Sequence, residues 1–325
     1  MRVRSTRRQV EYALNLMTSP KLHRVLNNRK GLRSLTKTEY QAILSTHGED
    51  ALIHSARTRE NYRSALMLFA EYGRTIQKEL SELTKEDIRF YFSRRSEDVG
   101  QSMLDQERQT IQRYMQLVSE QLSGTEQLPI YQTEKVEELS TRAYLTAQIG
   151  KIIEHQSHKN ALATQIAYTS GLRASEFYTL RPIAERAPDH RPASTKKWLG
   201  GMESWRRYTV KGKGGLIREV RIRPDLAREL ELLKYKYVKV MSDRKVTYFQ
   251  NYGVGAGNAL SSSFSRASKK AFSWSNGFHG LRHTYVQERM HHLVVENHID
   301  YDESLEIVSQ ELGHFRPSIT LAYLR

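Results

Sequence analysis

Apolar residues recur at helical spacing in three successive segments of the first half of the chain. The first segment begins near Thr58 and ends at Gly73, with apolar positions at Tyr62, Ala65, Leu66, Phe69 and Tyr72. The second opens at Thr84, and Asp87 stands three residues on as in a variant capping box. The third runs from Leu104 to Leu122. These amphipathic segments, within roughly seventy residues, predict a small helical bundle.

Between residues 205 and 223 the period of the pattern changes to two. This segment contains the glycine-dense run KGKGG, with alternating residues on both sides of it. Such a pattern is typical of a β-hairpin, and it predicts that Lys211 and Lys213 lie at the tip.

Helical spacing flanks this hairpin on both sides. Apolar positions between Tyr144 and Ala167 predict helices that stop at Gly171, and a further helix is predicted from about Pro224 to Val240. The Gly- and Ser-rich residues 251–270 predict a loop that leads into a short basic helix. The core of a final helix is predicted at Leu305, Val308 and Leu312.

These elements divide the chain into a helical part and a mixed part. A polar segment at 126–141 contains Pro129 and shows no sustained period, so we interpret it as a linker. We therefore expect an N-terminal arm at 1–48, a helical domain at 49–125 and a second domain at 142–325. The predicted fold class is mostly α, with a small β-hairpin or sheet in the second domain.

The charge of the chain indicates the kind of partner. Its 325 residues include 51 Lys and Arg against 36 Asp and Glu, a net charge of +15 with a pI near 9.8. Such an excess favours a polyanion, nucleic acid first and an anionic membrane surface second. Residues 1–40 carry ten basic side chains against two acidic ones, which predicts either a basic arm that follows DNA phosphates or a solvated, partly disordered leader. On the helical domain, arginines of the outer faces suggest DNA contacts at Arg57, Arg59, Arg63, Arg108 and Arg113.

The composition also excludes several kinds of chemistry. The chain has no cysteine, so disulfides, thiol nucleophiles and Cys-ligated metal sites are ruled out. No apolar run approaches the ~20 residues that a membrane span needs, and the N-terminus lacks the apolar block of a secretory signal. The Gly-rich residues 251–270 match no nucleotide-binding loop. We expect a cytoplasmic, DNA-associated protein without metal or cofactor.

Residues with the chemistry of a phosphodiester site are spread over the second domain, at Arg173, Lys213, His279, Arg282, His314 and Tyr323. Guanidiniums can meet the negative charge that develops on phosphoryl oxygens. A phenol has an ordinary pKa near 10, so Tyr323 needs a base or a cationic field to attack at neutral pH. A lysine could protonate the leaving hydroxyl, and histidines could bind oxygens or accept the tyrosine proton. Glu176 and His283 are interpreted as supporting residues.

Four sequence boxes that hold these residues resemble those of the tyrosine recombinase (phage integrase) family. GLRASE from Gly171 is similar to the first-arginine box, and HGLRH from His279 is similar to the His-x-x-Arg-His box. LGH, with a tyrosine nine residues after its histidine, resembles the last box. VKGKGGLIREVRI resembles the lysine hairpin, and aligning its Gly-Lys-Gly core together with Arg218 selects Lys213 over Lys211.

The resemblance implies a site-specific DNA recombinase, with a helical core-binding domain and an α/β catalytic domain that clamp duplex DNA. It implies that Arg173 and Arg282 bind the scissile phosphate, that Lys213 is the general acid and that His279 and His314 assist. Tyr323 would form a 3′-phosphotyrosyl bond. Four protomers would exchange strands through a Holliday junction without metal or ATP, and the free protein would be a monomer or weak dimer.

Two alternatives stay open: a type IB topoisomerase-like nicking and rejoining enzyme, and a non-catalytic DNA-binding protein on the same fold. The sequence departs from the family pattern in a longer stretch before LGH, which takes in HHLVVENHIDYDE. It also ends two residues after Tyr323, where many members carry a helix that docks onto the neighbouring subunit. Whether Tyr323 docks in its own site or through a neighbour stays open, as does the DNA target.

Overall fold

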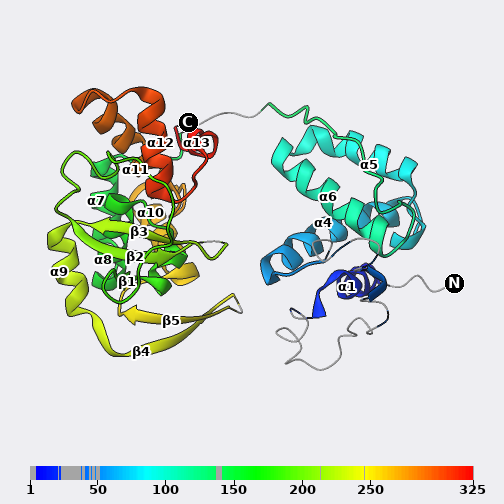
Figure 1. Cartoon of the computed structure of the whole chain (residues 1–325). Helices are drawn as coiled ribbons and strands as arrows, with labels where there is room; N and C mark the ends of the chain where they lie inside the picture. Colours follow the sequence, from blue (N-terminus) through cyan, green and yellow to red (C-terminus); the bar gives the residue numbers. More distant parts are fainter. Residues whose placement is uncertain are drawn as a thin grey trace. The chain divides into compact units, whose positions relative to one another are not determined.

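A computed structural model of the chain describes residues 5–20, 22, 38, 41–43, 45, 48, 52–136, 141–212, 214–244 and 246–324. The chain divides into two compact units, Met1–Glu138 and Leu139–Arg325 (Figure 1). Helices are the main secondary structure of both units, and the named strands belong to the second. The predicted fold class, mostly α with a small sheet, is therefore confirmed. No helix in the described ranges is long and apolar enough to span a membrane.

The first unit is a helical bundle built on one apolar cluster. Within the described residues its helices include α1 (Thr6–Met17), α4 (Ala56–Thr75), α5 (Lys85–Asp98) and α6 (Gln101–Leu117), with the short helix η2 (Leu80–Glu82) between α4 and α5. The predicted capping box begins α5, where the backbone N–H of Asp87 donates to Thr84 Oγ1 and that of Thr84 donates to Asp87 Oδ2. The three predicted helices are confirmed, although α6 ends five residues before Leu122.

The predicted N-terminal arm differs from the structure over its first part, because Thr6–Met17 forms helix α1 of the bundle. Val10, Ala13, Leu14 and Met17 are buried against α4 and α6 in the apolar cluster. The helical spacing of these residues was a signal that the basic composition obscured. Of the ten basic side chains predicted for the arm, Arg7 and Arg8 are exposed. The others lie outside the described residues: Arg2, Arg4, Lys21, Arg24, Arg29, Lys30, Arg33 and Lys37.

The segment predicted as a linker also differs over its first half, which packs on the bundle. Leu128 is buried, and the ring of Tyr131 stacks on Phe92 with centroids 4.4 Å apart. Gln101 fixes the backbone there, since its Nε2 donates to Tyr131 O at 2.9 Å and its Oε1 accepts from the N–H of Thr133 at 3.0 Å. The apolar residues on either side of Pro129 follow neither helical nor strand spacing. The segment was therefore interpreted as a linker.

The second unit combines helices with two small antiparallel sheets. Its elements in chain order are α7 (Thr146–Glu154), α8 (His158–Ser170), η3 (Ala174–Thr179), β1 (Arg181–Pro182), β2 (Arg206–Lys211), β3 (Ile217–Ile222), α9 (Pro224–Leu232), β4 (Lys234–Asp243), β5 (Val246–Tyr252), α10 (Gly257–Phe272), α11 (Gly280–His291), η4 (His292–Glu296), α12 (Tyr301–Leu312), α13 (Pro317–Thr320) and η5 (Leu321–Tyr323). The first sheet has the order β1, β2, β3, and the second pairs β4 with β5.

The predicted hairpin is confirmed as β2 and β3. Their register pairs Arg206 with Ile222 and Lys211 with Ile217, so the connecting turn spans residues 212–216. Lys213 in this turn lies outside the described residues. The final helix is likewise confirmed as α12, with Leu305, Val308 and Leu312 buried.

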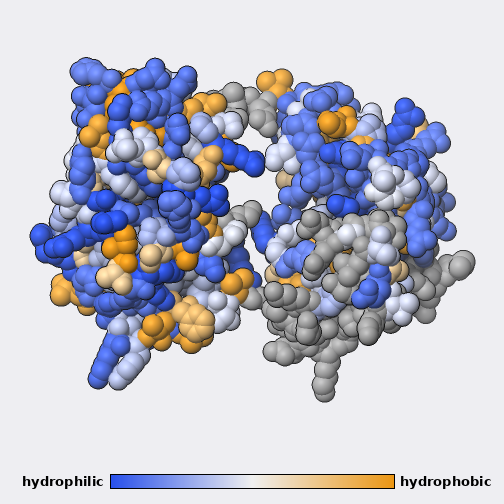
Figure 2. Space-filling view, in the orientation of Figure 1, coloured by the Kyte–Doolittle hydropathy of each residue, from blue (hydrophilic) through white to orange (hydrophobic). Residues whose placement is uncertain are grey.

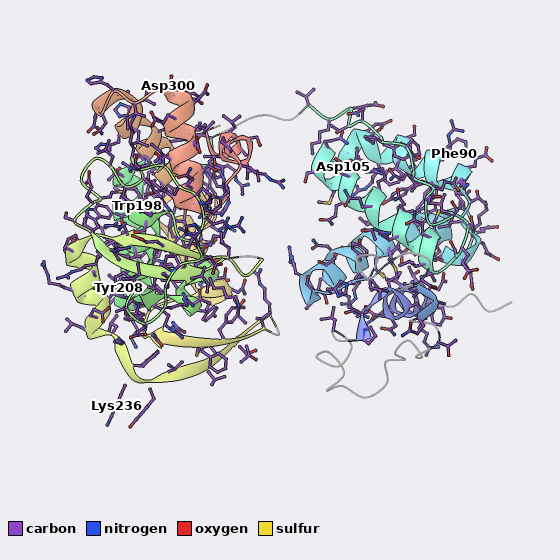
Figure 3. The ribbon with its side chains drawn as sticks, in the orientation of Figure 1. Phe90, Asp105, Trp198, Tyr208, Lys236 and Asp300 are labelled. Carbon is purple, nitrogen blue, oxygen red and sulfur yellow. The ribbon has the colours of Figure 1, made fainter. Side chains whose placement is uncertain are left out.

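One prediction in the middle of the unit is wrong, and another is wrong only in the length of a loop. The helix predicted up to Val240 ends at Leu232, because Tyr and Val alternate with Lys from Lys234 on and pair as strand β4 with β5. This ribbon is mostly exposed: Lys236 points away from the unit in Figure 3, and apolar side chains lie over the ribbon in Figure 2. The Gly/Ser-rich residues lead into a basic helix as predicted, but this helix, α10, already begins at Gly257 because Leu260, Phe264 and Ala267 form a buried face, so the loop is shorter than predicted.

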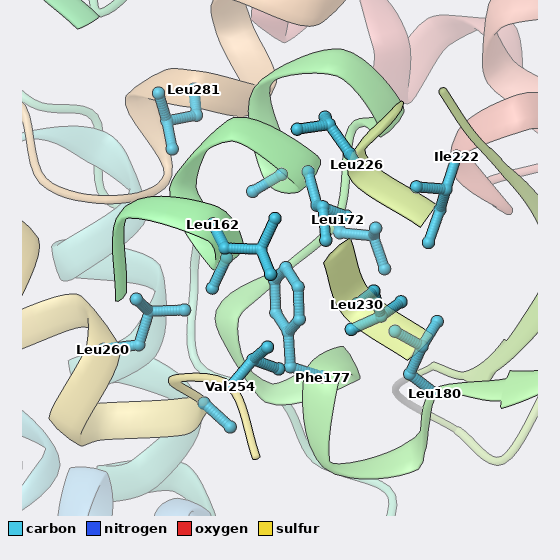
Figure 4. Packing of buried hydrophobic residues seen from close by; sticks show 14 of the residues in the cluster. Leu162, Leu172, Phe177, Leu180, Ile222, Leu226, Leu230, Val254, Leu260 and Leu281 are labelled. Atoms are coloured by element: carbon cyan, nitrogen blue, oxygen red, sulfur yellow. The ribbon is translucent and has the colours of Figure 1, made fainter. Parts of the chain in front are cut away.

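Two apolar clusters support the second unit. The larger one contains Leu162, Leu172, Phe177, Leu226 and Leu281 and fills the space between the helices and the first sheet (Figure 4). The smaller one joins the long β1–β2 connection to α11, α12 and the C-terminal turn, through Trp198, Met202, Val286, Val308 and Tyr323. The segments that carry the predicted site residues are therefore fixed by burial from both sides.

Candidate active site

Arg173 follows a tight helix stop at the end of α8. Gly171 there has a φ of +61°, and a Cβ at this position would lie 2.7 Å from Tyr285 Cδ1, so only glycine fits. The turn makes Arg173 the first residue before η3, where its backbone N–H donates to Glu176 Oε2 at 2.8 Å and its Nη1 to Oε1 at 3.0 Å. Arg173 is thereby held in one orientation.

Arg282 is the most enclosed of the predicted site residues, with 1% of its surface exposed. From α11 it donates through Nη1 to the carbonyl of Gly171 and through Nη2 to that of Leu312 at 2.8 Å. It therefore binds the ends of both helices that precede the first-arginine box and the LGH turn. Burial and the charge of Arg173 lower the pKa of Arg282 to about 9, which leaves it protonated at neutral pH.

His314 lies where two guanidiniums converge. Its Nε2 is 3.0 Å from Nη2 of Arg173 and 3.0 Å from Nη2 of Arg282, and its Nδ1 is 3.4 Å from Thr320 Oγ1. Burial and then the charges of Arg282 and Arg173 lower the pKa of His314 to about 3. The ring is therefore neutral at neutral pH, and this network assigns its proton to Nδ1, so that Nε2 accepts from both arginines.

Tyr323 packs against the histidines of its own chain. Its ring centroid is 5.4 Å from that of His279, 4.8 Å from His283 and 5.5 Å from His314, and the guanidinium of Arg282 is 5.7 Å from it. Only 8% of Tyr323 is exposed, and its carbonyl accepts from Gln287 Nε2 at 3.1 Å. The phenol is therefore placed in cis. For His279, which keeps a solvent-exposed side, desolvation and then the charge of Arg282 lower the pKa.

The long stretch before LGH leaves this geometry intact. It forms the short π-helix η4 and the N-cap Asp300, after which α12 packs against α11. The two helices are tied by Arg289, which binds the buried carboxylate of Glu311 at 2.9 Å, and by Tyr285, whose hydroxyl donates to Glu311 at 2.8 Å.

Glu176 is a buried carboxylate shared by these cations, with 1% exposure. Burial alone would raise the pKa of its carboxyl, but the charges of Arg218, Arg282 and Arg173 outweigh this effect and lower the pKa to about 2. One negative charge thus meets three guanidiniums. The centre carries an excess of about two positive charges, which suits an anion.

Five of the six predicted site residues lie together in this centre, and Lys213 lies outside the described residues. The prediction gave Glu176 and His283 supporting places, and both lie against the predicted residues. In the sequence analysis Arg218 was used only to align the hairpin, yet in the structure its guanidinium binds Glu176. Strand β3 carries both Arg218 and Arg221, and nothing in the sequence distinguishes the inward side chain of Arg218 from that of Arg221.

The five arginines predicted to bind DNA are less available than expected. The structure places Arg59 inside the bundle and not on an outer face, since it is 4% exposed and donates to Glu11 at 3.0 Å and Asn15 at 2.9 Å. Arg63 is paired with Glu11 and Glu60 at 2.6 and 2.7 Å, and Arg108 donates to Leu128 O. Arg113 is half-buried beside Gln116, while Arg57 is exposed.

Solved structures share this architecture. XerH site-specific recombinase bound to palindromic difH substrate, in a post-cleavage complex, aligns with a TM-score of 0.55 at 18% identity, over 98% of this chain and 90% of that one. Its pre-cleavage complex aligns with a TM-score of 0.54 at 16% identity, over 98% and 91%. A lambda integrase dimer bound to a COC′ core site aligns with a TM-score of 0.50 at 16% identity, over 96% and 79%.

No protein-family model and no curated protein sequence matches the chain. At the identities of the solved structures the likeness concerns the fold, and the chain has the fold of the tyrosine recombinases. The family resemblance that four short boxes predict is confirmed at this level.

Proposed function

We propose that the chain is a site-specific DNA recombinase that cleaves and rejoins DNA through Tyr323. The observation that carries this proposal is the packing of the Tyr323 phenol, within one chain, against three imidazoles and the guanidinium of Arg282. A phenol there faces a centre with excess positive charge, which favours attack on an anionic phosphodiester.

The scissile phosphate would bind where Arg173 and Arg282 converge. Their Nη2 groups meet at one acceptor, His314 Nε2, so a phosphoryl oxygen that replaced this nitrogen as the acceptor would receive both donors. Because Glu176 accepts from Nη1 of Arg173, and the carbonyls of Gly171 and Leu312 accept from Arg282, both guanidiniums are already oriented before negative charge develops. The bound phosphate would thus be oriented for attack by the Tyr323 oxygen.

The proton transfers follow from the protonation states. Tyr323 attacks phosphorus, its proton passes to the neutral imidazole of His279, and the P–O5′ bond breaks. The leaving 5′ oxygen takes a proton from a general acid, for which the family resemblance gives Lys213. In rejoining, a 5′ hydroxyl attacks the phosphotyrosine and releases the phenol.

Partners and energy source follow from this chemistry. The phosphotyrosyl bond retains the energy of the phosphodiester, so we expect strand exchange without ATP, and guanidinium charge makes a divalent metal unnecessary for cleavage. XerH and lambda integrase are solved on DNA, the latter as a dimer. For this chain we propose duplex DNA as the substrate and a tetramer on paired sites.

The test is a covalent complex on DNA. A randomised duplex pool is selected for binding to the wild-type chain, and the selected duplex is then nicked at successive positions, giving a set termed here the nicked probe duplex. Cleavage beside a nick releases a short 5′-hydroxyl fragment and traps the protein. We expect a denaturant-resistant complex with the wild type and none with Tyr323→Phe.

Tyr301→Phe is the matched control. Tyr301 is exposed at the start of α12, and this substitution removes the same hydroxyl away from the site. Both variants should bind the uncut duplex as the wild type does. A complex that persists in Tyr323→Phe would refute the nucleophile, and its absence from the wild type at every nick position would favour a non-catalytic DNA-binding protein. Plasmid relaxation by isolated protomers, without exchange between paired sites, would favour the topoisomerase-like alternative.

A further inference from the structure

Arg218 is a buried cation on strand β3, with 4% exposure, and its guanidinium bridges two segments of the site. Nη2 donates to Glu176 Oε2 at 2.8 Å, and Nη1 donates to the carbonyl of Glu311 at 2.7 Å. Resting on the proposed function, we infer that Arg218 is a positioning residue for cleavage. It neutralises part of the Glu176 charge, so that Arg173 can bind the phosphate. It also holds the turn that places His314 beside Arg173 and Arg282.

The first part of this role concerns the charge of Glu176. Its Oε1 accepts from the side chain of Arg173, and its Oε2 accepts from the backbone of Arg173 and from Arg218. Arg218 therefore shares the carboxylate with Arg173. Without Arg218, the full negative charge of Glu176 would act on Arg173 and Arg282, and the excess positive charge of the centre would fall from about two to about one.

The second part concerns the turn that carries His314. Arg282 binds the carbonyl of Leu312 and Arg218 binds that of Glu311, so guanidiniums cap two consecutive carbonyls at the C-terminal end of α12. Gly313 packs directly over Arg218, because a Cβ there would lie 2.6 Å from Arg218 Cδ. Removing Arg218 would leave a buried carbonyl without its donor and open space beneath the turn.

Neighbouring arginines on the same sheet provide a comparison. Arg207 on β2 donates to Glu219 at 3.0 Å and is about half exposed, on the side of the sheet away from Glu176. It shares the charge and strand environment of Arg218 but not the contacts with Glu176 and the α12 terminus. Arg207→Met is therefore the matched control.

The experiment uses the full chain and the nicked probe duplex. Arg218→Met should form the covalent complex more slowly by about tenfold to a hundredfold, while it binds the uncut duplex as the wild type does. Arg207→Met should form the complex at the wild-type rate. A purely structural role would also slow the reaction, so the deciding readout is Glu176→Gln added to Arg218→Met. Because the added change removes the charge that Arg218 neutralises, the double variant should react faster than Arg218→Met alone.

Equal rates for Arg218→Met and the wild type, or a double variant slower than Arg218→Met, would overturn the inference. If Arg218→Met does not fold, Arg218→Lys decides, because it keeps the charge near Glu176 but cannot reach both acceptors. We then expect wild-type thermal stability within a few degrees and a complex formed about tenfold more slowly, and an unchanged rate overturns the inference. Failure of the wild type itself to form a complex would instead count against the proposed function.

Discussion

Two groups of enclosed arginines, one in each unit, differ in the acids that surround them. In the helical unit, Arg59 and Arg63 bind Glu11, Arg63 also binds Glu60, and Arg95 binds the buried Glu107 at 2.8 Å. In the second unit, Arg173, Arg218 and Arg282 surround the single carboxylate of Glu176. The first group is close to neutral, whereas the second keeps positive charge.

Burial of an arginine therefore does not by itself indicate function. A cation matched by an acid stabilises the packing around it and has little charge left for a ligand. Cations that outnumber their acids can persist in a packed site only with backbone carbonyls and a neutral histidine as acceptors, as Arg282 shows. Such a site is ready for an anion. The excess of charge, not the presence of arginine, separates the two regions.

The largest expected effect is on catalysis in the second unit. Arg173→Met should slow formation of the covalent complex by about a hundredfold to a thousandfold, because one of the two donors that meet at His314 is lost. Thermal unfolding should change little, since Glu176 retains Arg218. Single-turnover kinetics and thermal melts check both statements. A large loss of stability with normal kinetics would show that Arg173, like Arg59, stabilises the fold and does not act in catalysis.

The converse outcome is expected for Arg59 in the helical unit. Arg59→Met should destabilise the protein by about 1–3 kcal/mol, because Glu11 and Asn15 each lose a buried donor. Complex formation by the folded variant should match the wild type. Urea unfolding measures the stability, with the exposed Arg57→Met as control; equal midpoints for the two variants would contradict the structural role of Arg59.

A smaller effect concerns acid stability of the cationic centre. The pKa of His314 is about 3 in the folded protein and near 6.5 when unfolded, so the unfolded chain binds the extra proton between these values. Stability should therefore fall as pH decreases below about 6.5 and stay level above it. His314→Gln should lessen this slope between pH ~6.5 and ~4.5, a window above the titration of Glu176. A slope unchanged by the substitution would count against an enclosed neutral ring.

The smallest effect is expected at Arg57, the exposed arginine of the five predicted DNA contacts. Arg57→Gln should weaken DNA binding a few-fold for specific and unrelated duplexes alike, and lower the salt slope by about one. Arg59→Gln should leave that slope unchanged. Binding isotherms at several salt concentrations separate the two, and identical slopes would show that exposure does not decide which arginine contacts phosphate.

How much of the molecule could be predicted from its sequence depended on whether the signal was local. The bundle helices, the β2–β3 hairpin and the last helix follow from periodicity and turn residues, which act over a few positions. The ribbon of β4 and β5 was missed, because the apolar positions of residues 224–240 also fit helical spacing. The pairing of Arg59 with Glu11 joins residues 48 positions apart, which no local pattern shows.

The sequence predicted the reactive residues of the candidate site, but not the residues that hold them in place. Three of the four boxes located the residues that meet at His314 and Tyr323, since each combines a turn signal with a reactive side chain, and the placement of Lys213 from the fourth box stays a prediction. The inward orientation of Arg218 and the excess of charge around Glu176 arise from three-dimensional packing. They are therefore seen in the structure alone.

Whether Tyr323 acts within its own chain can be decided by complementation between two inactive variants. Tyr323 packs among the histidines of its own chain, so we predict that one chain supplies both the nucleophile and the cations. Tyr323→Phe keeps the cations, and Arg173→Ala keeps the nucleophile. Mixed on the nicked probe duplex, the two variants should form no more covalent complex than Arg173→Ala does alone. Restored complex formation in the mixture would show that the tyrosine acts in a neighbour's site and would contradict the account.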